Sequence, residues 1–109
     1  MPIPLRRPGR VSGAMLHLVA RFHARDGCEA QVAAALRDQI LKVRAEPGCI
    51  SIAAMRATRD PRLFFIVSRW QDEAAFDIHA ALATTQRFVE TMQALIDHPF
   101  DPSRAVEIA

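Results

Sequence analysis

The feature that most constrains the fold is the segment 63–70, whose centre is apolar without interruption. Its β-branched and aromatic residues are typical of a β-strand, in which successive side chains point to opposite faces. Apolar side chains occur on both faces, with Leu63, Phe65 and Val67 on one and Phe64 and Ile66 on the other. A strand of this kind has to be covered on both sides.

Hydrophobic periodicity predicts further elements on either side of this strand. Strands are predicted at residues 15–23, 49–58 and 104–108, and helical segments at 29–45, 72–80 and 84–97. The last two helical segments follow each other directly, so the element order is β-α-β-β-α-β. This order predicts an α+β fold of the ferredoxin-like, split βαβ type, in which a four-stranded antiparallel sheet has its helices on one face.

The helices of such a fold can cover only one face of the sheet. The other face needs a second sheet, and its simplest source is an identical subunit related by a two-fold axis. A chain of 109 residues also buries only a thin core by itself. We therefore expect a homodimer.

The N-terminal segment differs in composition from the rest of the chain. Residues 1–14 are rich in proline and hold arginines but no acidic residue, which predicts an irregular arm in front of one domain at residues 15–109. The domain itself shows no basic patch of the kind that binds nucleic acid. No segment has the length and apolar character of a membrane anchor or signal peptide. We expect a cytoplasmic protein that binds neither nucleic acid nor membrane.

The spacing of cysteine and histidine argues against a disulfide and against a metal site. Cys28 and Cys49 lie at opposite ends of a predicted helix about 25 Å long, too far apart for a disulfide. His17 and His23 share a strand face, but about 20 Å separates them, too far to bind one ion. We expect two free thiols, no metal and no cofactor held by a Gly-rich phosphate loop.

Trp70 and His79 are the candidates for chemistry. Trp70 is the only tryptophan and ends the central strand, and His79 follows on the next helix. An aromatic wall and a titratable imidazole beside an apolar pocket suit the binding and deprotonation of a hydrophobic acid. Both residues also have a structural interpretation, because a tryptophan commonly anchors a small core and a helix histidine is often simply hydrogen-bonded or exposed.

Several stretches of the chain together resemble a known family. They are Met15–Arg21 (MLHLVAR), Arg44–Cys49 (RAEPGC) and Val67–Phe76 (VSRWQDEAAF), followed by His79. From about Met15 to Ile108 the chain resembles the antibiotic-biosynthesis monooxygenase family. The resemblance implies a dimeric α+β barrel. Its members include oxygenases that convert polycyclic phenols or quinols into quinones, with O₂ as co-substrate and without metal or flavin.

The resemblance also implies site residues between the helices and the sheet. The catalytic candidates are His79, as the base, and Trp70, as the pocket wall, and the substrate-binding candidates are Phe76, Ile66, Phe88 and Met92. Phe76 stands where anthrone-oxidising members are expected to have a tyrosine, and Ile66 where they are expected to have an asparagine. Haem-degrading relatives use an asparagine, a tryptophan and a histidine. Of these three, only the tryptophan has a clear counterpart in this chain, which is Trp70.

The resemblance thus predicts a cofactor-independent monooxygenase that oxidises a quinol, an anthrone or a related small aromatic compound. Two alternatives remain open. One is a non-catalytic small-molecule-binding dimer of the same fold. The other is a different activity of dimeric α+β barrels, such as isomerisation, lyase chemistry or haem handling. Oxygen uptake in the presence of quinols would separate the first prediction from the others.

Overall fold

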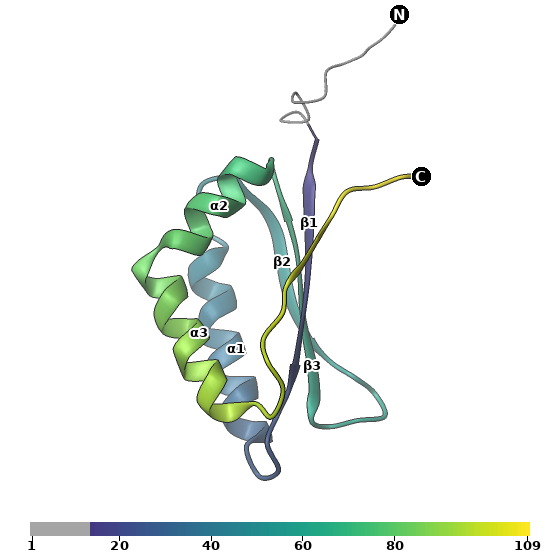
Figure 1. Cartoon of the computed structure of the whole chain (residues 1–109), viewed down its shortest axis with the longest axis vertical. Coiled ribbons are helices and arrows are strands. Elements are labelled where there is room, and N and C mark those ends of the chain that lie inside the picture. Colours follow the sequence, from purple (N-terminus) through teal and green to yellow (C-terminus); the bar gives the residue numbers. More distant parts are fainter. Residues whose placement is uncertain (1–13) are drawn as a thin grey trace, which may run out of the picture.

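The computed structural model describes residues 14–109, so the predicted N-terminal arm lies outside the described residues except for its last position. Within this range the chain forms four strands and three helices (Figure 1). In order they are β1 (Leu16–His23), α1 (Glu29–Val43), β2 (Cys49–Arg56), β3 (Leu63–Trp70), α2 (Glu73–Ala81), α3 (Ala83–Leu95) and β4 (Ser103–Ala105). The strands pair antiparallel in one sheet of order β2-β3-β1-β4.

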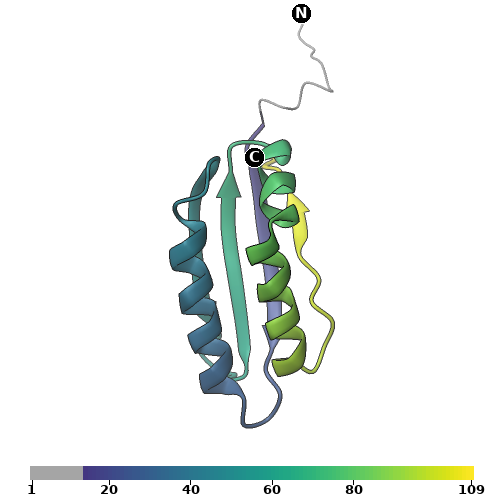
Figure 2. The ribbon, with the colours of Figure 1, turned by 90° about the vertical axis from the view of Figure 1, so that its left-hand side faces the viewer.

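All three helices lie on one side of this sheet (Figure 1), and α1 and α3 run side by side across it (Figure 2). The predicted ferredoxin-like α+β fold, with helices on one face of an antiparallel sheet, is confirmed. The inward stripe of α1 is the predicted one, since Val32, Leu36, Ile40 and Val43 are all buried. No helix of the described part of the chain has the length and apolar character needed to cross a membrane.

The core lies between these helices and the inner face of the sheet. The strict alternation of β1 buries Leu16, Leu18, Ala20 and Phe22, which all point toward the helices. On β3 the residues paired with them are Trp70, Ser68, Ile66 and Phe64. Directly paired residues of an antiparallel sheet share a face, so Phe64 and Ile66 are the pair on the helix side.

The outer face of the sheet carries the other apolar set of β3. Phe65 pairs with Met55 of β2, and Val67 pairs with Val19 of β1. Met55 is 47% exposed and Val19 40% exposed, and no helix covers this side. Phe65 and Val67 are therefore the pair that would face a second subunit. The homodimer itself stays a prediction.

The elements differ from the predictions mainly at their ends. The predicted strand 104–108 is only Ser103–Ala105, because it pairs with β1 alone at the sheet edge and the apolar side chains beyond it, Val106 and Ile108, are exposed. The last helix ends at Leu95 rather than at residue 97. Ile96 is already extended and forms a bridge with Ala24, which draws the chain back toward the sheet.

Candidate functional site

A cavity of about 220 Å³ lies between the helices and the inner face of the sheet. Its lining is mostly apolar, and the polar side chains that border it are few. They come from five elements and are Gln39 of α1, Ser68 of β3, His79 of α2, Thr85 of α3 and Arg104 of β4. A cavity with this lining suits a small, largely apolar ligand that makes a few directed polar contacts.

A carboxylate orients His79, the histidine that borders this cavity among the described residues. His79 is 9% exposed, and its Nδ1 lies 2.6 Å from Oε1 of Glu46. Because an ionised carboxylate can only accept, we assign the Nδ1 proton to this hydrogen bond, which leaves Nε2 as the basic nitrogen of the neutral ring. Within residues 14–109, Nε2 has no hydrogen-bond partner, and Thr85 Oγ1 lies 3.4 Å from Nδ1. Because His79 borders the cavity, its Nε2 is the candidate atom for proton transfer with a ligand there.

Trp70 forms the wall beside this imidazole. It is completely buried, and its Nε1–H donates to Ser68 Oγ at 3.0 Å. Its ring centroid lies 4.8 Å from that of His79 at an interplanar angle of 30°, and Phe76 packs edge-on at 5.6 Å. The two aromatic rings restrict the orientation of the imidazole, and they exclude water from one side of it.

A tight turn and a helix cap bring Glu46 and His79 together. Glu46 lies in the turn after α1, and this turn ends at Gly48, whose φ is +84°. Gly48 packs closely against α2. A Cβ added at this position would lie 2.5 Å from the Cβ of Ala75. Asp72 caps α2 by accepting from the backbone N–H of Ala75 at 2.9 Å. The close approach of turn and helix is what places Glu46 within reach of His79.

Arg104 closes the β4 side of the cavity but is already paired. Its Nη1 lies 2.8 Å from Glu73 and 2.8 Å from Asp77, and its guanidinium stacks 4.9 Å from the centroid of Phe76. Hydrogen bonds to the two carboxylates raise the pKa of Arg104 further above its usual value. Since two carboxylates already pair with this one guanidinium, Arg104 is a poor candidate for binding an anionic ligand.

Most of the residues predicted for the site border this one cavity. They are His79, Trp70, Phe76, Ile66 and Phe88. Met92 does not border it, since its side chain is fully buried in the core cluster that contains Phe22 and Leu36. Two residues at the site were not predicted from the sequence: Glu46, which lies 33 residues from its partner His79, and Gln39, which borders the cavity. A polar residue within the apolar stripe of α1 was the available signal for Gln39.

Both cysteines are free, as predicted. Cys49 begins β2 next to the turn that carries Glu46. Burial, reinforced by the carboxylate of Glu46, raises the pKa of the Cys49 thiol. This thiol is therefore protonated at neutral pH and is a poor candidate for a nucleophile.

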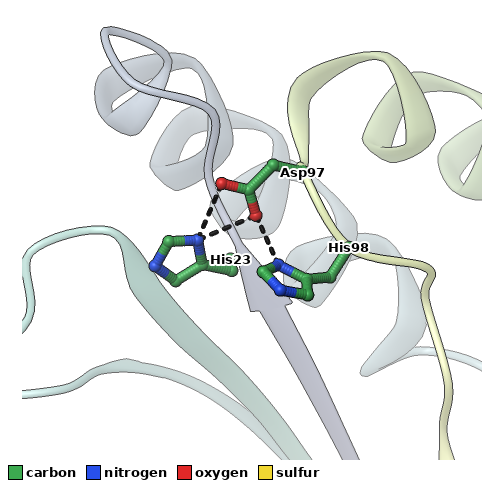
Figure 3. Close-up of side chains that lie close together, drawn as sticks. All are labelled: His23, Asp97 and His98. Carbon is green, nitrogen blue, oxygen red and sulfur yellow. Dashed lines mark hydrogen bonds and ion pairs between the residues drawn. The ribbon is translucent and has the colours of Figure 1, made fainter.

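A second group of titratable side chains lies away from this cavity, at the end of β1. His23, Asp97 and His98 offer ligand atoms within 4.8 Å of one another and could hold a metal ion (Figure 3). This set could not be predicted from local spacing, because His23 is 74 residues from Asp97 along the chain. The expectation that no closely placed set of ligands exists is corrected by this cluster.

The cluster of His23, Asp97 and His98 also holds parts of the fold together. The Nδ1 atoms of His23 and His98 lie 2.8 and 2.6 Å from Asp97 Oδ1, and Arg62 reaches Oδ2 at 3.0 Å. Arg62 also donates to the carbonyl oxygen of Ala24 at 2.9 Å. Hydrogen bonds from His23 and His98 lower the pKa of Asp97. One carboxylate thus connects the end of β1, the start of β3 and the end of α3.

Together the fold and the cavity define an α+β protein with a mostly apolar cavity under its helices and a carboxylate-oriented imidazole in the wall. Residues 15–91 match the family model described as Antibiotic biosynthesis monooxygenase, and the chain belongs to this family. A comparison with curated proteins found no match.

Solved structures with the same fold agree with this assignment. A protein from Shewanella oneidensis is 28% identical with a TM-score of 0.82, and the match covers 87% of this chain and 92% of that one. A protein from Pseudomonas aeruginosa is 26% identical with a TM-score of 0.80, covering 88% and 96%. A structure described as an antibiotic biosynthesis monooxygenase is 26% identical with a TM-score of 0.75, covering 86% and 97%.

Proposed function

We propose that this protein is a cofactor-independent monooxygenase that oxidises a phenol or quinol with O₂. The observation that carries the proposal is the His79–Glu46 pair, in which Nδ1 is held by a carboxylate at 2.6 Å while the other nitrogen has no partner within residues 14–109. This is the arrangement of a general base whose tautomer is fixed by a second residue. Membership of the family and the named neighbour support the reaction class.

In this mechanism the chain supplies the proton transfers and the substrate supplies the electrons. Nε2 of His79 accepts the proton of a phenolic hydroxyl, and the imidazolium is balanced by Glu46. The phenolate reduces O₂, and a bond forms between oxygen and a ring carbon that carries hydrogen, which lies para to the phenolate oxygen in a phenol and ortho to it in a quinol. After His79 protonates the peroxide, loss of the proton from this carbon and cleavage of the O–O bond give a quinone, hydroxylated where the substrate is a quinol, and hydroxide, which becomes water. One oxygen atom enters the product and one leaves as water.

The size of the cavity supports a ligand of one or two rings. An apolar protein cavity of about 150 Å³ is large enough to bind benzene. The cavity beside His79 measures about 220 Å³, which suits a single ring or two fused rings better than the three rings of an anthrone. Trp70, Phe76 and Phe88 provide the aromatic surfaces against which such a ring would pack.

The proposal is tested by oxygen uptake. With a panel of one- and two-ring phenols and quinols, the native chain should consume O₂, and His79→Ala should lower the rate by about 10²–10⁴-fold. Glu46→Gln should lower the rate in the same direction, because an amide leaves the ring tautomer undefined. His98→Ala is the matched control, since this imidazole is exposed and lies outside the cavity. Full turnover in His79→Ala would exclude the mechanism.

A non-catalytic binding protein is the second candidate, and one observation favours it. Phe76 offers no hydroxyl and Ile66 no amide to the cavity, so few donors are available to stabilise a phenolate. On this alternative the chain binds the same aromatic compounds but consumes no O₂ with any of them.

A further inference from the structure

Gln39 is a polar side chain of the cavity that the proposed mechanism does not use, and it differs from Ser68, Thr85 and Arg104 in having no side-chain partner within residues 14–109. It lies on the inward stripe of α1 between Leu36 and Val43, and it is only 6% exposed. Within residues 14–109 its amide has no hydrogen-bond partner, and neither of its polar atoms is completely sealed from open space. Gln39 borders the cavity and also a groove between α1 and α3 on the outer side.

An amide in this position is costly unless something binds it. Buried polar groups in native proteins are nearly always hydrogen-bonded, and a partnerless one destabilises the folded chain. Leucine would fill the same space in the stripe without this penalty. A glutamine at the wall of an apolar cavity is therefore explained best by a hydrogen bond to the molecule that occupies the cavity.

The position of Gln39 relative to the base defines what it could recognise. His79 reaches the cavity from α2, and Gln39 reaches it from α1, so the two polar groups come from different walls. The surfaces between them are apolar and aromatic, among them Ile66 and Trp70. A ligand that satisfies both groups is a largely apolar molecule with two oxygens that reach different walls, and the para positions place two oxygens farthest apart on one ring.

We propose that Gln39 is a specificity-determining residue that binds a second oxygen of the ligand and so selects para-dioxygenated rings over simple phenols. This inference rests on the proposed function, because it takes the hydroxyl at His79 as the first oxygen. An amide can donate to a carbonyl and accept from a hydroxyl, so Gln39 can bind both the quinol and the quinone.

The test compares two ligands that differ in one oxygen. Binding of 1,4-naphthoquinol and of 1-naphthol to the full chain is measured by titration calorimetry under argon, where no oxidation occurs. The native chain should bind the quinol about 5- to 10-fold more tightly, the value of one hydrogen bond. Gln39→Leu should remove this difference and leave the affinity for 1-naphthol unchanged. Gln31→Leu, on the exposed side of α1, is the matched control.

A thermal melt of the free protein provides an independent readout. Gln39→Leu should raise the melting temperature, because it replaces a partnerless amide by an apolar side chain in a buried stripe. A lower melting temperature would show that the amide is a structural group. Gln39→Asn retains an amide but shortens its reach, and it should weaken quinol binding without the gain in stability.

The outcomes separate this inference from the proposed function. Equal affinity of the native chain for both ligands, or equal weakening of both by Gln39→Leu, overturns the role of Gln39 and leaves the oxidation intact. Selective binding that depends on Gln39 in a chain that consumes no O₂ supports the inference and excludes the oxidation. Absence of binding by either ligand overturns both.

Discussion

At the scale of single residues, two histidine–carboxylate groups in this molecule differ in what surrounds them. Beside the cavity, Glu46 engages one nitrogen of His79, and the other nitrogen has no hydrogen-bond partner within residues 14–109. At the end of β1, the carboxylate of Asp97 is shared by two imidazoles and by Arg62. The first group leaves one imidazole nitrogen without a partner in a residue that borders the cavity, whereas the carboxylate of the second is shared by three cationic or titratable side chains. Burial and partner number therefore favour His79 over His23 and His98 as the proposed base.

Asp97 should make the stability of the chain depend on acid pH. Hydrogen bonds from His23 and His98 lower its pKa in the folded state, so the folded value lies below the unfolded value of about 3.9. A carboxyl group of this kind stabilises the fold above its unfolded pKa, and the contribution is lost as the pH falls through the lowered folded value. Urea unfolding followed by circular dichroism should show this loss below about pH 4.

The matched variants are Asp97→Asn and Asp38→Asn, which make the same change of charge. Asp97→Asn should be less stable at neutral pH and should lose less stability on acidification than the native chain. Asp38 is exposed and pairs only with Lys42 of the same helix, so its variant should keep the native pH dependence. An unchanged acid profile in Asp97→Asn would contradict the role assigned to this carboxylate.

At the scale of elements, the packing of α2 on the turn before β2 depends on one glycine. Gly48 has a φ of +84°, and an added Cβ would meet Ala75 at 2.5 Å. Gly27 has nearly the same φ, +85°, but nothing lies within 4 Å of its added Cβ. The two glycines share the backbone requirement and differ only in the contact.

Alanine substitutions at these two positions should separate backbone strain from packing. Gly27→Ala should lower the free energy of unfolding by about 1 kcal/mol, the cost of a left-handed non-glycine residue. Gly48→Ala should cost about 1–3 kcal/mol more, because two side chains would overlap in a packed contact. Adding Ala75→Gly should rescue Gly48→Ala by a positive coupling and should not rescue Gly27→Ala. Equal costs at the two glycines in urea unfolding would exclude the packing explanation.

The elements themselves were predictable where apolar periodicity was strong. The strand Leu63–Trp70 was predicted with its observed bounds, and α1 was predicted with its inward stripe. The last strand was predicted too long because Val106 and Ile108 look like strand residues locally, yet no partner beyond β1 is there to bury them. Element ends depend on tertiary contacts, which a local pattern does not contain.

The candidate site was predictable only in part, for the same reason. His79 and Trp70 were identified from residue type and from the resemblance, and they lie ring to ring at 4.8 Å. The contact of His79 with Glu46 joins elements that are distant along the chain. The cluster around Asp97 likewise brings together side chains from both ends of the domain. Such contacts depend on the order of the strands and on helix packing. The spacing of residues along the sequence does not predict them.

At the scale of the whole molecule, the outer face of the sheet is the surface that the fold leaves uncovered. Paired residues across β2, β3 and β1 form an apolar patch on this face, made of Ala53, Met55, Phe65, Val67 and Val19. All helices pack on the opposite side (Figure 1). Sheet faces with such side chains are normally packed against another layer, and a second copy of the same face can supply it through a two-fold axis.

We therefore expect a homodimer formed through this patch, and Phe65→Glu should dissociate it. In the subunit alone Phe65 is only half-buried, so the charge should leave the fold intact, whereas in the dimer it would be buried without a partner at a cost of about 3–5 kcal/mol. Leu41→Glu is the matched control, because Leu41 is 68% exposed on α1, which lies on the helix side. Sedimentation velocity at micromolar concentration should give a dimer for the native chain and for Leu41→Glu, and a folded monomer by circular dichroism for Phe65→Glu. A native chain that sediments as a monomer would contradict the predicted homodimer.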